Sequence, residues 1–561
     1  MSDGTMNLTA AGKETPRPRR QRSALAWPIA LIALLLMLPI LSVLANLLEP
    51  DQGSWAHLSQ TLLPRYLMNS LLLVLGVGLL VPLIGSATAW LTTLCRFPGD
   101  SFFTWALVLP LAVPGYVVAY AYTDVLDVAG PLQTWLRATF EWQVGDYWFP
   151  NIRSLPGAAL LLSLVLYPYV YLLARAAFLQ QSACVLEVGR TLGYRPWGLF
   201  FSVALPLARP AIAAGTALAL METLADYGTV SFFGVSTFTT GIVRAFSAFG
   251  DRIAAAQLAA VLLVGVLALL LLERWSRSRK QYHHTTGRYS SLPQFQLSGL
   301  RAALAILACG LPLALGFLVP AGLLFWMWLD QAQGKIDSRF LGWAWNSFSL
   351  GAITALLAVL IGLLLAYGLR QRGNRLLAGL ARLAGMGYAV PGTVIAVGAI
   401  IPLAALDHAL ADLLRDLFGV NSGLLLSGSI VALVYAYLVR FLSVSLSTLD
   451  ASLSKVRYSL DEAARNLGRR PASVLYEIHA PLLASGLATA ALLVFVDVMK
   501  ELPATLLLRP FNMDTLAVQA HNLASDERLA DAGLPSLAIV AVGILPVIVL
   551  SRAIAKGRPG L

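Results

Sequence analysis

Twelve long apolar segments divide this chain, and they constrain its fold more than any other feature of the sequence. Each has about 20 residues, enough for a helix to cross a hydrocarbon layer of about 30 Å. Hydrophobic residues make up 58% of the 561 residues and charged residues 12%, which is typical of a membrane protein. The sequence therefore predicts an all-α polytopic membrane protein with twelve transmembrane helices. The segments lie at 25–47, 67–92, 102–123, 155–177, 206–227, 254–272, 302–328, 347–369, 383–405, 423–445, 481–502 and 534–554.

The distribution of Lys and Arg predicts the orientation, because positively charged loops are retained on the cytoplasmic side. With both termini inside, the basic residues of 274–301, of 370–382 and of the tail at 551–561 all fall in the cytoplasm. The basic stretch before 25–47 is not followed by a small-residue cleavage site, so we expect an uncleaved anchor. The net charge of +11 is explained by this bias, and we expect no nucleic-acid partner.

The chain consists of two related halves. The linker at 274–301 separates six segments from six, so both halves enter the membrane in the same sense, as two parallel six-helix repeats. Asn69-Ser70 recurs as Asn346-Ser347 at an offset of 277. We expect a first transmembrane domain at 65–273 and a second at 342–550. The remaining parts are a cytoplasmic N-terminus with the first helix at 1–64, the cytoplasmic linker at 274–301, a seventh helix with a periplasmic loop at 302–341, and a cytoplasmic tail at 551–561.

A polar segment interrupts each half. Residues 187–196 and 462–471 share the pattern Glu-x-x-Arg-x-Leu-Gly-x-Arg-Pro at an offset of 275. Glu and Arg at i and i+3 share one face of a short helix, glycine suits the position just past its end, and proline suits the start of the next helix. The pattern predicts a helix, a glycine turn and a second helix on the inner membrane surface. Fixed glycine and proline positions favour protein docking over a loop that rests on lipid head groups.

A Val-Pro-Gly sequence also occurs in each half, with Pro114 in the third segment and Pro391 at the matching position of the ninth. Proline removes a backbone donor and glycine removes packing bulk in mid-span. Membrane helices break where protein or water satisfies the freed carbonyls. The two prolines therefore mark either bends that line a central pathway or ordinary packing kinks.

Two acid pairs follow the polar segments at corresponding positions. Glu222 and Asp226 match Asp497 and Glu501 at an offset of 275, and Lys500 lies beside the second pair. The helix rise places these carboxylates toward the outer ends of the fifth spans, about 24 Å beyond the start of each. Acids at membrane depth usually face a cavity or a partner, and these would then offer oxygen ligands to a highly charged cation. Ion pairing at a helix end in water is the alternative.

The second polar segment resembles the coupling motif of ABC importer permeases of the binding-protein-dependent type, which reads Glu-Ala-Ala, three residues, Gly. The first copy departs from it, since Val188-Gly189 replaces both alanines. The resemblance implies the transmembrane fold of ABC type I importers, in which the motif helix docks into a cleft of an ATP-binding subunit, one copy for each half. It would make these residues ATPase-coupling residues: Glu187, Arg190, Gly193, Glu462, Ala463, Ala464 and Gly468.

The segments around the acid pairs, 221–242 and 497–511, look like those of fused ferric-iron permeases. That resemblance implies a bacterial inner-membrane protein that takes Fe3+ as its substrate from a periplasmic binding protein. The aromatic segment 232–249 would be an outer gate or a docking element, although anchoring at the head-group level explains its aromatics equally well. Fused thiamine permeases share the two-half layout, so another small solute is an alternative.

Other classes of protein fit the sequence less well. No Gly-x4-Gly-Lys-Ser/Thr loop occurs, so we expect ATP hydrolysis on a separate subunit, and no enzyme activity or firmly bound cofactor in this chain. The three cysteines and six histidines form neither a disulfide framework nor a metal-ligand pattern. A secondary transporter with twelve helices remains an alternative, but it needs no docking segment for an ATPase.

Overall fold

The computed structural model describes residues 26–48, 54–180, 196–278, 294–331, 336–370, 379–381, 383, 385–420, 423–469 and 473–556. These residues form a bundle of helices, accompanied by one parallel pair of two-residue strands, β1 (Cys95–Arg96) and β2 (Phe295–Gln296). Ten of the described helices are long and apolar enough to cross a membrane, and two bent helix pairs raise the number to twelve if each pair is one span. The predicted all-α membrane fold is confirmed.

The first half runs from α1 to α13. Its third predicted span is broken, because 100–112 and 115–140 meet at 90° where Pro114 interrupts the chain. The described elements are α1 (Ala26–Ala45), η1 (Asn46–Leu48), α2 (Ser54–Thr61), α3 (Leu63–Leu94), α4 (Asp100–Ala106), η2 (Leu109–Ala112), α5 (Gly115–Leu126), α6 (Pro131–Phe140), α7 (Leu155–Gln180), α9 (Pro196–Leu199), η3 (Phe200–Ala204), α10 (Leu205–Ala225), α11 (Gly228–Phe232), α12 (Phe238–Val243), η4 (Arg244–Ala248) and α13 (Arg252–Ser278).

The second half runs from α14 to α26. Its fifth predicted span is broken in turn, because 474–482 and 484–499 meet at 78°. The described elements are α14 (Leu300–Leu313), η5 (Ala314–Leu318), α15 (Val319–Trp326), η6 (Met327–Gln331), α16 (Ser338–Arg370), η7 (Gly387–Ala389), α18 (Gly392–Phe418), α19 (Ile430–Leu453), α20 (Tyr458–Asn466), η8 (Val474–His479), α22 (Ala480–Leu482), α23 (Ala484–Met499), α24 (Pro503–Leu508), α25 (Leu516–Ser525) and α26 (Leu529–Lys556).

Equivalent side chains of the two halves make equivalent contacts. Asn69 Nδ2 donates to the carbonyl of Ser236 at 2.8 Å, and Asn346 Nδ2 donates to the carbonyl of Asp514 at 3.0 Å. Each asparagine thereby ties the start of the second span to a loop near the end of its half, between α11 and α12 in the first half and between α24 and α25 in the second. The repeat at an offset of 277 is therefore a repeat of structure, as the sequence predicts.

The two halves are interleaved, because the first helix of each packs against the other. Helix α1 of the first half lies along α18, and α15 of the second half lies along α5. The approach is so close that a Cβ added to Gly398 of α18 would clash with the carbonyl oxygen of Pro39 in α1. Neither half therefore buries its core alone.

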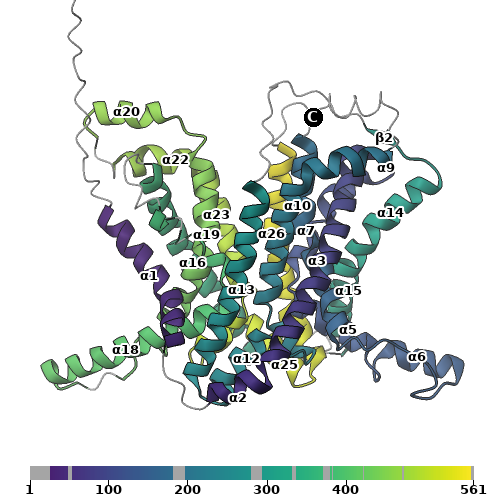
Figure 1. The fold of residues 1–561 in the computed structure, drawn as a ribbon, viewed down its shortest axis with the longest axis horizontal. Helices are drawn as coiled ribbons and strands as arrows, with labels where there is room; N and C mark the ends of the chain where they lie inside the picture. The colour runs from purple at the N-terminus through teal and green to yellow at the C-terminus, as the bar shows by residue number, and fades with distance from the viewer. Residues whose placement is uncertain are drawn as a thin grey trace, which may run out of the picture.

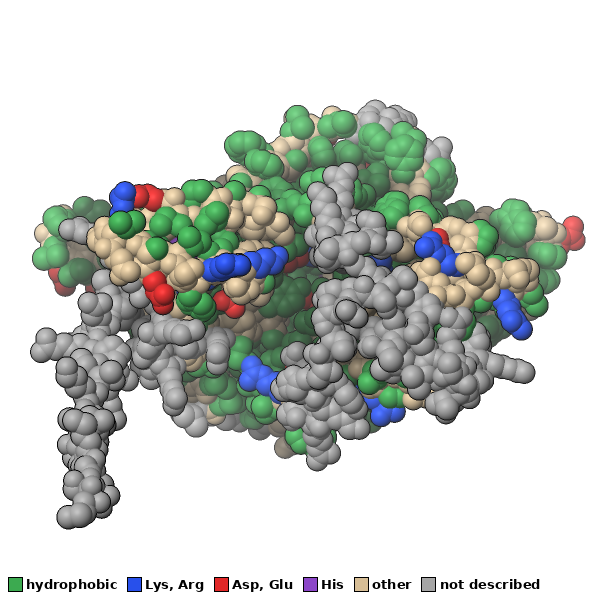
Figure 2. Space-filling view, turned by 90° about the horizontal axis from the view of Figure 1, so that it is seen from above, with side chains coloured by type: hydrophobic (Ala, Val, Ile, Leu, Met, Phe, Trp, Pro, Cys, Tyr) green, Lys and Arg blue, Asp and Glu red, His purple; other side chains and the backbone are tan. Residues whose placement is uncertain are grey.

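The bundle has two different ends. Helices α9, α20 and α22 lie at one end, and α2, α12 and α25 lie at the other (Figure 1). Helix α1 starts and α26 finishes at the α20 end, so the described ends of the chain lie on the same side. Figure 2, which looks onto the α20 end, shows Lys and Arg side chains on that face and hydrophobic side chains behind and beside them. Lys455 and Arg457, just before α20, and Arg469, just after it, are exposed.

Candidate functional site

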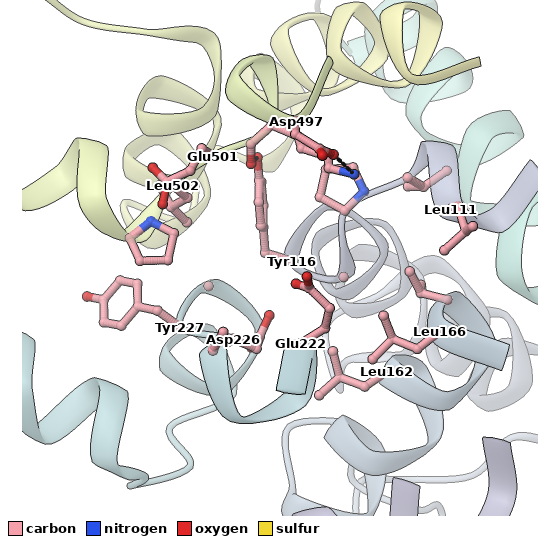
Figure 3. Close-up of a pocket in the computed structure, with 18 of the residues that line it drawn as sticks. Leu111, Tyr116, Leu162, Leu166, Glu222, Asp226, Tyr227, Asp497, Glu501 and Leu502 are labelled. Carbon is pink, nitrogen blue, oxygen red and sulfur yellow. Dashed lines mark hydrogen bonds and ion pairs between the residues drawn. The ribbon is translucent and has the colours of Figure 1, made fainter. Parts of the chain in front are cut away.

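A cavity of about 130 Å³ lies at the interface of the two halves. Helices α5, α7 and α10 supply one side of its wall, and α19, α23 and the segment before α24 supply the other. Figure 3 shows Glu222 and Asp226 on the side of the first half and Asp497 and Glu501 on the side of the second. The four predicted acids thus converge on one cavity, together with Lys500.

The members of each acid pair have different roles. Helix α10 ends at Ala225, so Asp226 lies beyond it and caps the next helix, accepting from the backbone N–H groups of Thr229 and Val230 at 3.1 Å. Glu501 does the same for α24, accepting from Ala504 N and Thr505 N at 3.0 Å. The i, i+4 spacing does not put each pair on one helix face, because both helices end between the two acids.

Glu222 and Asp497 are the acids that remain inside the helices. Their side chains are partly exposed to the cavity. Asp497 pairs with Lys500 of its own half, with Oδ1 2.9 Å from Nζ. The sequence offered two interpretations of these acids, that they face a cavity or that they form ion pairs at a helix end. Each is incomplete alone, because the acids line a cavity between the halves and are also paired with cations.

Arg440 of α19 is a member of the site that the sequence reasoning missed. Its guanidinium lies 3.2 Å from Glu501 Oε1 and 3.8 Å from Glu222 Oε2, so it bridges acids of opposite halves. At the offset of 275 the first half has Val165, which leaves the arginine without a counterpart. A charged residue inside the predicted span 423–445 was the available signal.

The Val-Pro-Gly sequences let backbone approach these charges. Pro114 lines the cavity beside Gly115, whereas Pro391 precedes α18 and is not among the lining residues. A Cβ added to Gly392 would lie 2.6 Å from both Arg440 Nη1 and Glu501 Oε1. In the first half the bend thus lies at the cavity wall, and in the second half glycine makes room for the ion pair. That the two prolines line a translocation pathway stays a prediction.

Aromatic side chains cross between the halves beside the cavity. Tyr120 Oη lies 2.8 Å from Nδ1 of His521, which belongs to α25 of the other half. The Tyr120 ring meets Phe232 edge-on at 4.7 Å, and Tyr227 packs on the His521 ring at 5.6 Å. Burial lowers the pKa of His521 to about 4, so its imidazole is neutral at pH 7. Phe232 therefore packs within its own half, against a tyrosine that makes a contact between the halves.

The second polar segment has the predicted helix and glycine turn. Its first helix is α20, and Gly468 adopts φ +74° just beyond it, in the left-handed region that favours glycine. Glu462 and Ala463 are exposed, Ala464 is buried, and Leu467 is 81% exposed. At α20 and the residue after it, a charged side chain, Glu462, and an apolar one, Leu467, are thus both exposed to solvent. Helix α20 lies at one end of the bundle (Figure 1).

The first polar segment lies outside the described residues. The predictions for Glu187, Arg190 and Gly193 therefore stay predictions, as does any role for the side chain of Arg465. Helix α9 begins at Pro196, the position at which the sequence predicts a new helix.

A buried charged cluster that the sequence reasoning also missed holds α20 in place. Asp461, the residue before Glu462, accepts from Arg370 Nε at 2.7 Å and lies 2.6 Å from His479 Nε2. Arg370 ends α16 and also donates to the carbonyls of Leu453 and Val456. The cluster ties α20 to α16, α19 and η8. Its signal in the sequence was weak, because Arg370, Asp461 and His479 are far apart along the chain.

Among the described residues, no group of three or more His, Cys, Asp or Glu side chains is placed to hold a metal ion. Cys95 and Cys309 are buried free thiols, and Cys184 lies outside the described residues. The cavity between the two halves can therefore present carboxylates to a solute, with part of their charge balanced by Arg440 and Lys500.

Two interleaved six-span halves, a charged cavity between them and an exposed helix at one end define a membrane permease with the transmembrane fold of type I ABC importers. Residues 28–282, somewhat less than half of the chain, match the family described as binding-protein-dependent transport system inner membrane component.

Named relatives match either most of the chain or somewhat less than half of it. The chain is 28% identical over 548 residues to the Fe(3+)-transport system permease protein FbpB 2 of Haemophilus influenzae, covering 95% of this chain and 99% of that protein. It is 24% identical over 489 residues to the ferric transport system permease protein FbpB of Actinobacillus pleuropneumoniae, covering 83% and 67%. It is 26% identical over 256 residues to the sulfate transport system permease protein CysT of Escherichia coli, covering 44% and 88%.

Proposed function

We propose that this permease forms the whole translocation pathway for ferric iron, which a periplasmic binding protein delivers and two ATP-binding subunits drive through the membrane. The similarity to two proteins named as ferric permeases supports the choice of solute, and one of them matches along almost its full length. The α20 end would face the cytoplasm, because its exposed Lys and Arg side chains follow the bias of inner loops.

The observation that carries the proposal is the charge of the cavity. Four carboxylates line it, from Glu222, Asp226, Asp497 and Glu501, and two cations, from Lys500 and Arg440. Counting four negative and two positive charges leaves a net charge of −2 in a low-dielectric wall. Such a wall attracts a cation and repels an anion such as sulfate, although a sulfate permease is among the relatives.

Coupling to ATP hydrolysis would occur at the two polar segments. In the second, Glu462 of α20 and Leu467, the residue after that helix, are exposed and offer the charged and apolar contacts that a cleft on an ATP-binding subunit would take. The first segment carries the same Glu, Leu and Gly positions but has Val188-Gly189 between them, so we expect it to dock less tightly. The two polar segments would then couple to their ATP-binding subunits with unequal strength.

The test is uptake of labelled iron by vesicles that hold this chain, the ATPase and the loaded binding protein. We expect uptake that depends on ATP and on the ATPase, and that falls several-fold in the double variant Glu222→Gln, Asp497→Asn. These two acids are chosen because they are not helix caps. Asp412→Asn, an exposed carboxylate remote from the cavity, is the matched control.

Each contrary result points to a specific alternative. Iron uptake without an ATPase would overturn the importer proposal in favour of a secondary transporter. ATP hydrolysis stimulated by a binding protein loaded with thiamine, but not with iron, would keep the machine and replace the solute. Tyr116, Tyr169 and Tyr388 line the cavity and could stack on an organic cation of that kind, which makes thiamine the second candidate.

A further inference from the structure

Two segments project sideways from the bundle at the end opposite α20. The first lateral arm comprises α6 and the residues that follow it, 131–148. The second comprises the outer half of α18 and the described part of its return, 403–420 and 423–428. Both connect the third and fourth spans of their half, and they extend from opposite sides of the bundle (Figure 1).

The first lateral arm is internally ordered and apolar on its surface. Gln133 is buried and donates to the carbonyl of Leu126, and its Oε1 accepts from Tyr147 Oη at 2.8 Å. The rings of Phe140, Trp142 and Tyr147 stack in series at 4.7 and 5.3 Å. These contacts fix the arm in a shape that leaves large apolar side chains in the open. They are Trp135, Phe140, Trp142, Val144 and Trp148.

The second lateral arm has the same two properties. Asp407 is buried and accepts from the backbone N–H groups of Leu425, Leu426 and Ser427, which folds the return segment onto the helix. Leucines at helical spacing share one face of the helix, and charged residues occupy the opposite face. The leucines are Leu406, Leu410, Leu413 and Leu417, and the polar residues are His408, Asp412, Arg415 and Asp416.

We propose that both lateral arms lie in the head-group layer of the leaflet opposite α20, with their apolar faces against the acyl chains. Amphipathic helices lie in this plane, and exposed Trp side chains gather at this depth. The two arms run outward from the spans, where lipid surrounds the bundle, and not along its axis (Figure 1). Apolar contact would hold them there.

The net charge of each arm indicates that it would contact lipid through its apolar side chains and not by electrostatic attraction to anionic head groups. The first arm carries Arg137 against Glu141 and Asp146, and the second carries Arg415 against Asp407, Asp412 and Asp416. Both sums are negative, −1 and −2 with His408 neutral, so anionic lipids would not attract them. A binding protein centred over the cavity would meet the bundle axis, from which both arms point away.

Spin-label depth measurement in vesicles tests the proposal. Trp148→Cys, 87% exposed in the wild type, reports on the first arm, and Leu417→Cys, 65% exposed, reports on the second. The background replaces the three native cysteines by serine. Leu79→Cys, in the middle of α3, is the acyl-chain reference. Leu467→Cys, just after α20 and with no ATPase present, is the water reference.

We expect both arm labels to give oxygen and nickel-chelate accessibilities between the two references, equally in zwitterionic and anionic vesicles and with or without binding protein. Nickel-chelate accessibility as high as that of Leu467→Cys would overturn the proposal, because the arms would then stand in water. Shielding from the chelate that occurs only after binding protein is added would also overturn it, and would assign the arms to that protein.

Discussion

Replacing Asp461 by asparagine tests whether the buried cluster transmits movement between α20 and the spans. The carboxylate is 5% exposed and holds Arg370 of α16 and His479 of η8 on either side. Asparagine keeps the size of the side chain but removes its charge. We expect α20 to lose its fixed position while the bundle remains folded, because the spans retain their packing around α16 and α19.

The expected size of the effect follows from the partners that remain. Removing one partner of a buried ion pair costs about 3–5 kcal/mol. Arg370 keeps the carbonyls of Leu453 and Val456 at 2.7 and 2.8 Å, so it is not left unpaired. We therefore expect about 2–3 kcal/mol, which lowers the ratio of docked to undocked α20 by about 30- to 150-fold.

The assay is ATP hydrolysis by the reconstituted complex, with and without loaded binding protein. Asp461→Asn should lower the stimulated rate by about tenfold or more and leave the basal rate unchanged, since one contact to the ATPase is no longer held rigidly. Asp450→Asn, an exposed carboxylate near the same end of α19, is the control. Stimulation within twofold of the wild type, in a variant of normal thermal stability, would refute the reasoning.

Three further changes have defined outcomes. Gly392→Ala crowds Arg440 and should cost about 1–3 kcal/mol, seen as a lower Tm and slower uptake, whereas Gly322→Ala, with nothing within 4 Å, should change neither. Gly468→Ala places a side chain at φ +74° and should weaken capture of the ATPase, by about 1–2 kcal/mol of strain. Because the pKa of His521 is lowered in the folded protein, the unfolded state takes up a proton first as pH falls below about 6.5. The free energy of unfolding should therefore fall by about 2 kcal/mol between pH 6.5 and 5. In thermal melts, His521→Gln should reduce this dependence of stability on pH.

Spacing and composition predict those parts of the structure that depend on distance along the chain. The twelve spans, the duplication and the glycine turn after α20 belong to this group, because a bilayer fixes helix length and a positive φ favours glycine. The convergence of Glu222 and Asp497 could be predicted for the same reason. Equal positions in two parallel repeats lie at equal depth.

Contacts between distant segments could not be predicted in this way. Asp226 and Glu501 are helix caps because α10 and α23 end just before them, and a boundary shift of one or two residues decides that role. Arg440 bridges the halves because its side of α19 faces the interface. Sequence periodicity shows which residues share a helix face, but it does not show which segment that face packs against. The packing of α1 on α18 depends on the same kind of information.

The bridge made by Arg440 has a consequence for how such a permease can be assembled. In a homodimer every residue is repeated about the symmetry axis. An arginine at this position would therefore face the same arginine of the other subunit across the cavity, and the two like charges would repel each other. Here the corresponding position holds Val165, and the guanidinium stands on one side of the axis. Joining the halves in one polypeptide allows each wall of the cavity to change separately, so the two walls can differ in charge, which they cannot do in a homodimer.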